Sequence, residues 1–466
     1  MSADLLKRLV ETIGEKAVLR EAGAQEPYLV DQRGYYRGAA LAVVRPADAG
    51  EVAAVLRIAC EHGVSVVPQG GNTGLCGGAT PDSSGSQLVL SLERLDAIRE
   101  VDTIDYSVTV EAGAILQNVH DAVREHDLLF PLDLAAKGSC QIGGNLSTNA
   151  GGINVLRYGN ARELVLGLEV VLADGSIWNG LSNLRKDNTG YDLKHLFLGT
   201  EGTLGIITAA VLKLFPHPLN NRTILLAVSS PRSACGLLGS ARALSGDAVE
   251  SFEYISRAAL ECVLSRMGRK DPFDRPHEHY VLLELATGAA GELLDGMIES
   301  IMEKGMESGD ILDGVLAQNE RQRRELWELR ELISEAQRES VKNDVAVPIA
   351  SLPRFLEEAA KRVGAVAPGA RPCPFGHMGD GNIHYNILAP ESVEPREFRA
   401  RDGEALIDAV SDLAMSMHGS FSAEHGIGQL RRSMMERYKS PEALDLMRKL
   451  KAVMDPDGVL NPGKVV

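Results

Sequence analysis

Apolar residues recur at short, regular spacings through the first 215 positions, and each group predicts an element. Residues 40–66 predict strand, helix, strand: a β-branched run is followed by a helix with one apolar face and then by "VSVVP". The segment 165–178 predicts a hairpin that turns at Asp174-Gly175. Further strands are predicted at 87–92, 106–114 and 202–215, and a helix at 115–125.

The pattern changes at residues 216–221, "PHPLNN". Beyond them helical and strand segments alternate, glycine becomes less frequent, and a strand at 279–286 and a long helix near 319–340 stand out. This arrangement is typical of an α+β domain with an antiparallel sheet. A chain of 466 residues also exceeds what one core usually supports. We therefore predict two domains with a boundary between residues 217 and 218.

Charge and cysteine usage narrow the class of protein. A formal net charge of −16 argues against nucleic acid as a partner, because phosphates require a basic surface. Six scattered cysteines without a C-x-x-C pair give neither a ribbon-type zinc site nor a disulfide framework. A reduced, cytoplasmic compartment is therefore expected. The charged N-terminal segment lacks the apolar core of a signal peptide, and we expect no membrane span.

Glycine is the compositional anomaly. The chain has 47 glycines, and they gather at 70–78, 138–152 and 199–205. The run "VVPQGGNTGLCGG" (66–78) follows a predicted strand, so its backbone N–H groups can converge on an anion such as a pyrophosphate. Its spacing is neither that of a P-loop nor that of a Rossmann turn. A tight connection at a sheet edge is the alternative interpretation.

Two histidines flank a turn in "PFGHMGDGNIHYNI" (374–387). If Asp380-Gly381 forms a two-residue turn, His377 and His384 become cross-strand neighbours on one face. Glu424 in "SAEHGIG" could supply a carboxylate. Two imidazoles and a carboxylate are typical of a catalytic zinc site, and manganese, cobalt or ferrous iron are also admissible. Exposed hairpin histidines without a metal are the alternative.

The predicted helix near 319–340 carries an apolar stripe of Leu326, Leu329 and Ile333, with Arg330 and Ser334 on the neighbouring face. An arginine in such a position is usually solvated. It can also bind a carboxylate through two parallel hydrogen bonds.

These motifs resemble a known family. The runs "PQGGNTGL", "AKGSCQIGGN", "RKDNTGYDL" and "EGTLGIIT", followed by "GHMGDGNIHYN", "SAEHGIG" and "DPDGVLNPGK", resemble the FAD-linked oxidoreductases with a vanillyl-alcohol oxidase type of flavin domain, and within them the D-2-hydroxy-acid dehydrogenases. The resemblance implies an α+β flavoprotein of two domains. A vanillyl-alcohol oxidase/p-cresol methylhydroxylase type FAD-binding domain of two α+β subdomains would span 1–217. An α+β substrate (cap) domain with an antiparallel sheet and the metal-binding hairpin would span 218–420, and 421–466 would return to the FAD domain.

The resemblance also implies a set of residues that bind FAD. Asn72 stands where covalent relatives usually have histidine, so non-covalent FAD is implied. The implied cofactor residues are Pro68, Gly70, Gly71, Asn72, Thr73, Gly74, Leu75, Gly77, Gly78, Gly138, Ser139, Gly143, Gly144, Asn145, Thr148, Asn149, Gly151, Gly152, Glu201, Gly205, Ile206 and Asn461.

The same resemblance assigns the chemistry. It implies His377, His384 and Glu424 as ligands of a divalent metal, with zinc expected, and His425 as the catalytic base that also contacts substrate. Substrate carboxylates would be bound by Arg330, Ser334, Lys342 and Asn386. Ser334 and Asn343 stand where the resembling enzymes tend to have threonine and tyrosine, and both differences concern the distal group of the substrate.

The implied reaction is oxidation of a D-2-hydroxy acid to the 2-oxo acid, with hydride transfer to the flavin and proton transfer to His425. D-2-hydroxyglutarate is the leading substrate, and D-lactate, D-malate and glycolate are alternatives. A metal-dependent hydrolase or aldolase and a non-catalytic flavin-binding protein are the other classes. An electron-transfer flavoprotein, a quinone or a cytochrome would accept the electrons, and the sequence is compatible with a homodimer.

Overall fold

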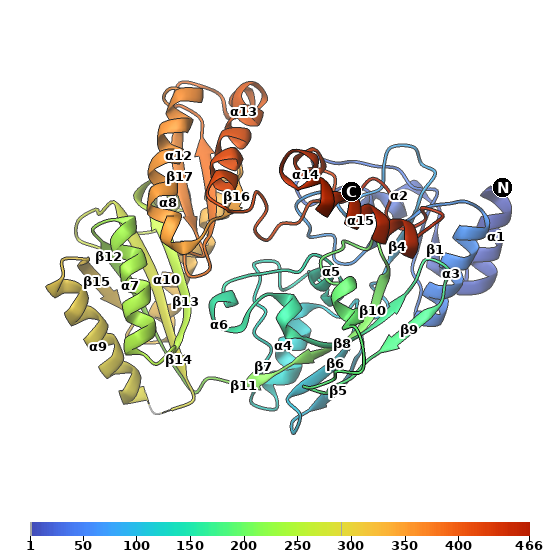
Figure 1. The fold of residues 1–466 in the computed structure, drawn as a ribbon, viewed down its shortest axis with the longest axis horizontal. Coiled ribbons are helices and arrows are strands. Elements are labelled where there is room, and N and C mark those ends of the chain that lie inside the picture. The colour runs from blue at the N-terminus through green and yellow to red at the C-terminus, as the bar shows by residue number, and fades with distance from the viewer. Residues whose placement is uncertain (1, 290) are drawn as a thin grey trace. The chain divides into compact units, whose positions relative to one another are not determined.

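The computed structural model describes residues 2–289 and 291–466. The chain forms two compact units (Figure 1). The first comprises the chain up to Gly152, Tyr158–His217 and Glu424–Val466; the second comprises Ile153–Arg157 and Pro218–Ala423. Among the described residues, none of the helices combines the length and the apolar character that crossing a bilayer requires.

Two short segments that were predicted to belong to the FAD-binding domain or its C-terminal return belong to the second unit instead. Ile153–Arg157 belongs to the second unit, where the Ile153 carbonyl accepts a hydrogen bond from Ser251 Oγ at 3.0 Å and Arg157 Nη1 donates to the Ala286 carbonyl at 2.8 Å. The residues before Glu424 also belong there, because Ala423 N donates to the Asp344 carbonyl at 3.3 Å.

The first unit begins with a four-stranded sheet of order β1-β2-β4-β3, in which β2 and β3 both run parallel to β4. The predicted strand–helix–strand over 40–66 is confirmed as β2, α3 and β3. Asp48 caps α3 by accepting from Glu51 N at 2.8 Å, as expected of an N-cap aspartate. The elements are α1 (Ser2–Ile13), β1 (Val18–Leu19), α2 (Ala22–Gln25), β2 (Ala42–Val44), α3 (Ala49–Glu61), β3 (Val66–Gln69) and β4 (Leu88–Ser91).

A second, five-stranded antiparallel sheet of order β5-β6-β10-β8-β9 follows. The predicted hairpin is confirmed, with Val171 opposite Ile177 across the turn at Asp174-Gly175. The strand predicted over 202–215 begins only at Ile206, because Gly202 has φ +71° and the preceding residues form a turn. The strands are β5 (Ile98–Asp102), β6 (Ser107–Glu111), β8 (Val165–Val171), β9 (Ile177–Gly180) and β10 (Ile206–Lys213).

Short elements complete the first unit, and the strands β7 and β11 pair with each other. These elements are α4 (Leu116–Arg124), β7 (Leu128–Leu129), α5 (Ile142–Ser147), β11 (Phe215–Pro216), α14 (Arg432–Tyr438) and α15 (Pro441–Met454); α6 (Val155–Tyr158) crosses the unit boundary.

The second unit is built on a seven-stranded sheet of order β15-β12-β14-β13-β17-β18-β16, in which every neighbouring pair is antiparallel. The antiparallel sheet predicted for this part of the chain is therefore confirmed. The strands are β12 (Asn220–Val228), β13 (Val249–Ser256), β14 (His279–Thr287), β15 (Ile311–Leu316), β16 (Asp344–Ala346), β17 (Arg371–Gly376) and β18 (Asn382–Leu388).

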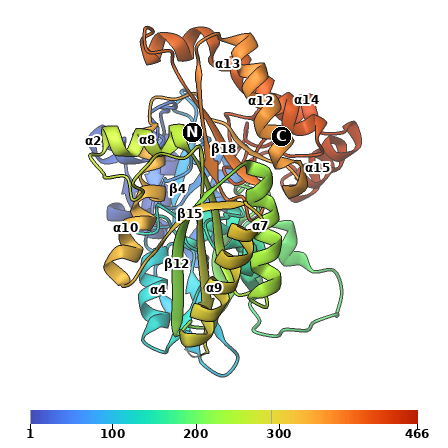
Figure 2. The ribbon, with the colours of Figure 1, turned by 90° about the vertical axis from the view of Figure 1, so that its left-hand side faces the viewer.

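Helices cover both faces of this sheet, and successive strand residues point to opposite faces. Leu226 faces a core that includes α7, α9, α12 and α13, whereas Leu225 faces one that includes α8, α10 and α11. Figure 2 shows α7 and α9 side by side on the first of these faces. The helices are α7 (Pro231–Leu244), α8 (Arg257–Arg266), α9 (Gly291–Glu307), α10 (Glu320–Glu331), α11 (Ile333–Ala336), α12 (Leu352–Val366) and α13 (Pro395–Ser416).

The prediction of one long helix near 319–340 is wrong in the extent of the helix. It is two helices, α10 and α11, separated at Leu332. The second helix places Ile333 and Ala336 in the core beside α8, and the chain leaves the helix at Gln337.

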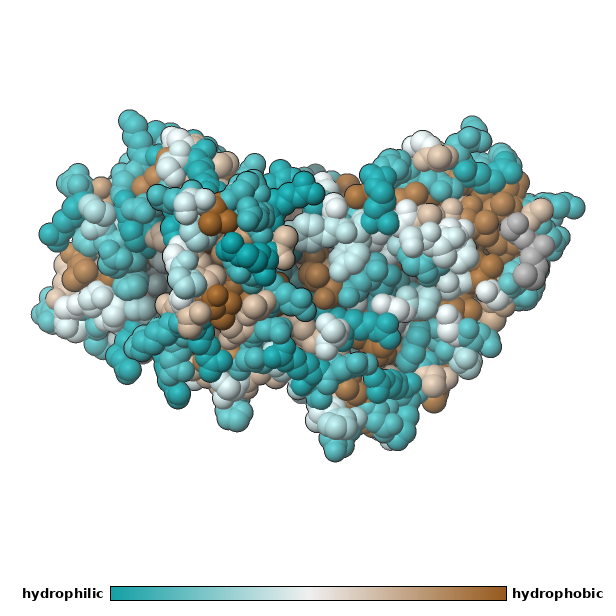
Figure 3. All heavy atoms as spheres, turned by 90° about the horizontal axis from the view of Figure 1, so that it is seen from above, coloured by the Kyte–Doolittle hydropathy of each residue, from teal (hydrophilic) through white to brown (hydrophobic). Residues whose placement is uncertain are grey.

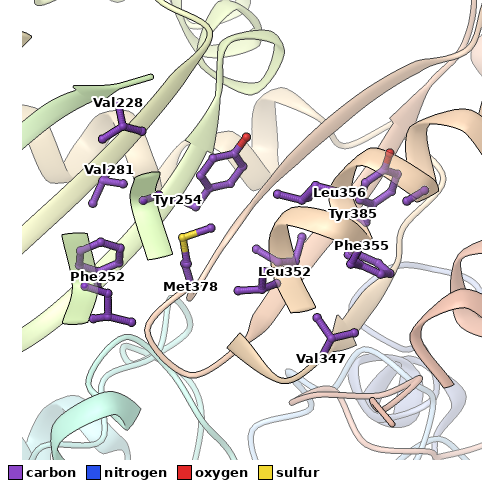
Figure 4. Close-up of a cluster of buried hydrophobic side chains, with 14 of the residues drawn as sticks. Val228, Phe252, Tyr254, Val281, Val347, Leu352, Phe355, Leu356, Met378 and Tyr385 are labelled. Carbon is purple, nitrogen blue, oxygen red and sulfur yellow. The ribbon is translucent and has the colours of Figure 1, made fainter. Parts of the chain in front are cut away.

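The core between the sheet and α12 is closely packed. Figure 4 shows Phe355 of α12 beside Tyr385 of β18, and the two rings meet edge to face with centroids 5.8 Å apart. The face of the molecule in Figure 3 is largely hydrophilic, with hydrophobic residues in small patches. Large apolar side chains such as Phe355 lie in the cores instead.

Phe355→Ala is expected to destabilise the protein by about 3–5 kcal/mol, because the ring is fully buried and its removal leaves a cavity. The control is Val453→Ala in α15, where the side chain is 78% exposed and the expected change is within about 0.5 kcal/mol. Urea unfolding followed by circular dichroism measures both. Equal midpoints for the two variants would contradict this packing.

Candidate functional site

A pocket lined mainly by glycine and other small residues lies in the first unit. It brings together the ends of β3 and β10, the loop after β3 and the helix α5. The sequence-predicted cofactor residues that line it are Pro68, Gly70, Gly71, Asn72, Thr73, Gly74, Leu75, Gly78, Gly143, Gly144, Asn145, Thr148, Glu201 and Ile206.

Two glycines show why side chains are absent here. A Cβ on Gly71 would lie 2.0 Å from the Ser139 carbonyl oxygen, so the two loops approach each other through bare backbone. A Cβ on Gly144 would meet no protein atom within 4 Å, although Gly144 lines the pocket. Gly71 therefore closes the wall of the pocket, and Gly144 leaves space inside it.

The other predicted cofactor residues are absent from the pocket lining, namely Gly77, Gly138, Ser139, Asn149, Gly151, Gly152, Gly205 and Asn461. Several of them support the lining residues. Asn461 Nδ2 donates to the Gly78 carbonyl at 3.0 Å and the Glu201 carbonyl at 2.8 Å. Gly205 packs where a Cβ would lie 2.6 Å from Val170. Their contact with a cofactor stays a prediction.

Sequence reasoning did not name some of the lining residues. Gln141 is one, and its Oε1 is buried without a hydrogen-bond partner among the described residues. A buried acceptor of this kind calls for a donor from a ligand or a water. Gln141 lies in the motif "AKGSCQIGGN", which was the available signal. Ser147 and Gly202 also line the pocket without having been named.

Glu201 attaches the C-terminal segment to this pocket. Its carboxylate is buried and accepts hydrogen bonds from Ile427 N at 2.7 Å and Gly428 N at 2.9 Å. Burial raises the pKa of Glu201, while these two backbone N–H groups act in the opposite direction. The two hydrogen bonds hold the segment that carries His425, which lies two residues before Ile427 and lines the pocket.

In the second unit, a buried carboxylate joins two of the predicted site residues. Glu253 Oε2 accepts a hydrogen bond from Arg330 Nε at 2.6 Å, and Glu253 Oε1 lies 2.7 Å from His377 Nδ1. The Arg330 guanidinium also lies over the Phe375 ring, 4.8 Å from its centroid. Arg330 is therefore buried and paired, unlike the solvated charge that its helical position alone would favour.

Burial alone would raise the pKa of the Glu253 carboxyl. The charges of Arg330 and His377 and the hydrogen bonds from both side chains outweigh that effect and lower the pKa to about 2. The carboxylate is thus ionised at neutral pH, which is the condition under which it accepts both hydrogen bonds.

The two histidines meet, but not through the predicted strand register. His384 pairs with Phe375 rather than with His377, and residues 377–381 form a longer turn than the predicted two-residue one. The reason is that Gly379 N bonds to the Phe252 carbonyl at 3.1 Å, and Asn382 N bonds to the His377 carbonyl at 3.2 Å, so the predicted Gly379–Asn382 pair does not form. The two imidazole centroids nevertheless lie 5.5 Å apart.

Asp344 is a further acid beside this histidine pair that sequence reasoning did not assign. It pairs with His384 across β16 and β18, and its Oδ1 lies 3.8 Å from His384 Nδ1. Asp344 directly follows Lys342 and Asn343 in "VKNDVAVP", and the sequence alone does not show that it lies beside His384.

Ser334, Lys342 and Asn386, the other predicted substrate residues, also lie in the second unit. Lys342 Nζ is 3.4 Å from the Ser334 carbonyl, so these two residues are neighbours. Asn386 is buried on β18 and donates through Nδ2 to Gln337 Oε1 at 2.9 Å.

Glu424 and His425 lie where the chain returns to the first unit, with His425 Nε2 3.5 Å from Glu424 Oε1. Both side chains are partly buried. Glu424 and His425 offer a carboxylate and an imidazole, and in the second unit Asp344 and His384 offer the same two donor types, which commonly hold a divalent metal.

Comparison with known proteins identifies the family. The family model described as "FAD linked oxidases, C-terminal domain" matches residues 217–465, and "FAD binding domain" matches residues 40–180. The chain belongs to the FAD-linked oxidase family. FAD is accordingly its cofactor, and the glycine-lined pocket with the unpartnered Gln141 Oε1 fits a ligand that approaches backbone closely.

Several relatives of this chain are named D-2-hydroxyglutarate dehydrogenase. The chain is 42% identical to the D-2-hydroxyglutarate dehydrogenase of Xanthomonas citri pv. viticola, over 91% of this chain and 89% of that protein. It is 38% identical to the mitochondrial D-2-hydroxyglutarate dehydrogenase of Bos taurus, over 98% of this chain and 82% of that protein.

Solved structures confirm the fold predicted from the resemblance. A crystal structure of p-cresol methylhydroxylase with substrate bound superimposes with a TM-score of 0.78 at 17% identity, covering 99% of this chain and 96% of that one. At this identity the similarity shows the fold alone.

Gly144→Leu is expected to leave the protein folded and to weaken FAD binding. The side chain would occupy space that no protein atom fills, and overpacking costs about 1–3 kcal/mol, or about 10- to 100-fold in affinity. The control is Gly364→Leu in α12, where an added Cβ also meets nothing within 4 Å. Visible flavin absorption of the purified proteins reports binding. Full flavin occupancy in Gly144→Leu would exclude this pocket as the FAD site.

Proposed function

We propose that this protein is a FAD- and divalent-metal-dependent dehydrogenase that oxidises D-2-hydroxyglutarate to 2-oxoglutarate. Similarity to D-2-hydroxyglutarate dehydrogenases over nearly the whole chain supports the substrate. The observation that carries the chemistry is that His425, the expected base, lines the glycine pocket of the FAD-binding unit.

His377, His384 and Glu424 would hold the metal, with zinc expected. When bound, a divalent cation acts as a Lewis acid that lowers the pKa of the substrate hydroxyl. Imidazole and carboxylate are donor types that suit a divalent metal, and Asp344 adds a carboxylate beside His384.

The loop over 70–78 and the helix α5 would hold FAD without a covalent bond, since Asn72 replaces the histidine of covalent relatives. When bound, FAD accepts the hydride from C2 of the substrate. The protein contributes the glycine backbone, which lets a flat ligand approach closely.

His425 is proposed to remove the hydroxyl proton of the substrate. An imidazole titrates near neutral pH, which suits a base that must accept and release a proton in each cycle. Glu424 lies 3.5 Å from His425 Nε2 and would stabilise the imidazolium that forms.

Arg330 and Lys342 are proposed to bind the carboxylates of the substrate, with Ser334 and Asn386 as polar neighbours. A five-carbon diacid needs a second cationic group that a short monoacid does not, and the pair Arg330 and Lys342 meets that need. Arg330 is held through Nε, so its terminal nitrogens keep the fork that binds a carboxylate.

Electrons would pass to an external acceptor such as an electron-transfer flavoprotein, a quinone or a cytochrome. A cytoplasmic location and a homodimer stay predictions, and the similar protein of Bos taurus is mitochondrial by name.

Anaerobic addition of D-2-hydroxyglutarate to the purified yellow protein should bleach its flavin absorption within one turnover. D-lactate, D-malate and glycolate should reduce the flavin more slowly, because they lack the distal carboxylate or place it differently. Faster reduction by one of these acids would assign that acid as the substrate. A protein whose flavin no 2-hydroxy acid reduces would overturn the proposed function.

His425→Ala is expected to retain FAD and to reduce the rate of flavin reduction by about 10²–10⁴-fold, the usual contribution of a positioned base. Stopped-flow absorbance measures this single turnover. His126→Ala, at an exposed histidine of the same unit, is the control and should behave as wild type. Near-normal reduction in His425→Ala would remove His425 from the mechanism.

A further inference from the structure

Two buried carboxylates lie on neighbouring strands beneath α10. Glu253 is on β13 and Glu284 on β14, where Glu284 faces Ser251 and Glu253 faces Leu282 in the register. Both are on the sheet face that α10 covers, since the alternating residues Phe252 and Leu283 belong to the core on the opposite face. Each carboxylate binds one arginine of α10, and these two arginines, Arg323 and Arg330, are two helical turns apart.

The partners of the two carboxylates differ in kind. Glu284 accepts hydrogen bonds from Arg323 at 2.7 and 2.8 Å and from Trp327 Nε1 at 2.8 Å, and Thr223 Oγ1 also bonds to it. These groups dock the helix on the sheet. Glu253 uses one oxygen for Arg330 in the same way, but its other oxygen binds His377 Nδ1.

We propose that Glu253 is a positioning residue that fixes the tautomer and ring orientation of His377 as a metal ligand and, with its other oxygen, holds Arg330 for the substrate carboxylate. This inference rests on the proposed function for the roles of His377 and Arg330. It adds a residue that links the metal site and the carboxylate site through one side chain.

The chemistry of the contact dictates the tautomer. An ionised carboxylate only accepts hydrogen bonds, so the proton of the His377–Glu253 bond must be on Nδ1. In the neutral imidazole the lone pair is then on Nε2, the atom that would bind a metal. A histidine ligand is typically oriented by such a carboxylate on its other nitrogen, and loss of that partner weakens metal binding by about 10–100-fold.

The geometry explains why a single carboxylate does both tasks. Glu253 lies fully inside the protein, with a residue exposure of 1%. A charge in that position requires hydrogen-bond partners on both oxygens. Arg330 and His377 provide them, and Phe375 packs against Arg330 and His384 at centroid distances of 4.8 and 5.0 Å. Rotation of Arg330 or His377 would leave the carboxylate short of a partner.

The test is zinc binding to the FAD-loaded protein after chelation, measured by calorimetric titration with Zn²⁺ alone. Glu253→Gln keeps the shape of the side chain and removes its charge. It is expected to bind zinc about 10–100-fold more weakly than wild type while retaining FAD. Glu284→Gln is the matched control, because it removes the other buried carboxylate that anchors α10, and its zinc affinity should stay within about threefold of wild type.

Zinc affinity that is unchanged in Glu253→Gln, or equally weakened in Glu284→Gln, would overturn the inference, and so would wild-type protein that binds no zinc. If Glu253→Gln does not fold, nitrogen-15 spectra of histidine-labelled wild type decide instead. The signal lost in His377→Gln should show a proton on Nδ1, and a proton on Nε2 would overturn the inference. A wild-type protein that binds zinc but whose flavin no acid reduces would refute the proposed function alone.

Discussion

The carboxylate of Glu253 carries a charge inside the second unit, and a buried charge must be paired. Its pairing to Arg330 and His377 holds α10, the strand β13 and the turn at 377–381 in one arrangement. The sheet decides where this charge lies. Phe252 and Tyr254 enter the core with α7 and α12, so the residue between them must face α10. Apolar alternation along β13 thus places Glu253 toward the helix that carries Arg330.

In the first unit, glycines without side chains shape the pocket. Gly71 approaches the Ser139 carbonyl more closely than any other residue could, and Gly144 leaves open space in the pocket wall. Glu201 plays a part there that parallels that of Glu253, because it is also a buried carboxylate. Its partners are backbone N–H groups of Ile427 and Gly428 rather than side chains. Each unit thus has a buried acid whose hydrogen bonds hold a proposed functional histidine or the segment that carries it: Glu253 binds His377 in the second unit, and Glu201 binds the segment after His425 in the first.

The sequence allowed prediction where the signal is local. Period-two and period-3.6 patterns located β2, α3, β3, the β8–β9 hairpin and the antiparallel second sheet, and glycine density located the pocket. The turn after β17 differs from the prediction because Gly379 N bonds to the Phe252 carbonyl, a residue distant in the sequence, and Asn382 N bonds to the His377 carbonyl instead of pairing with Gly379. Glu253 had no local signal, since a single acid within "SFEYIS" reads as an exposed strand position until its arginine and histidine are known. The position of Asp344 beside His384 follows only from the register between β16 and β18, which the sequence does not show.

His425 is fixed from both sides along the chain. Before it, Ala423 N is bonded to the Asp344 carbonyl; after it, Ile427 N and Gly428 N are bonded to Glu201. The backbone between these anchors takes left-handed conformations at Gly426 and Gly428, with φ of +77° and +51°. A Cβ on Gly426 would lie 2.8 Å from Glu201 Oε1, and one on Gly428 would lie 2.1 Å from the Cys76 carbonyl oxygen. The glycines of "SAEHGIG" are therefore needed to keep this segment bonded to Glu201. A side chain at Gly426 or Gly428 would push the segment away, and His425 would move with it.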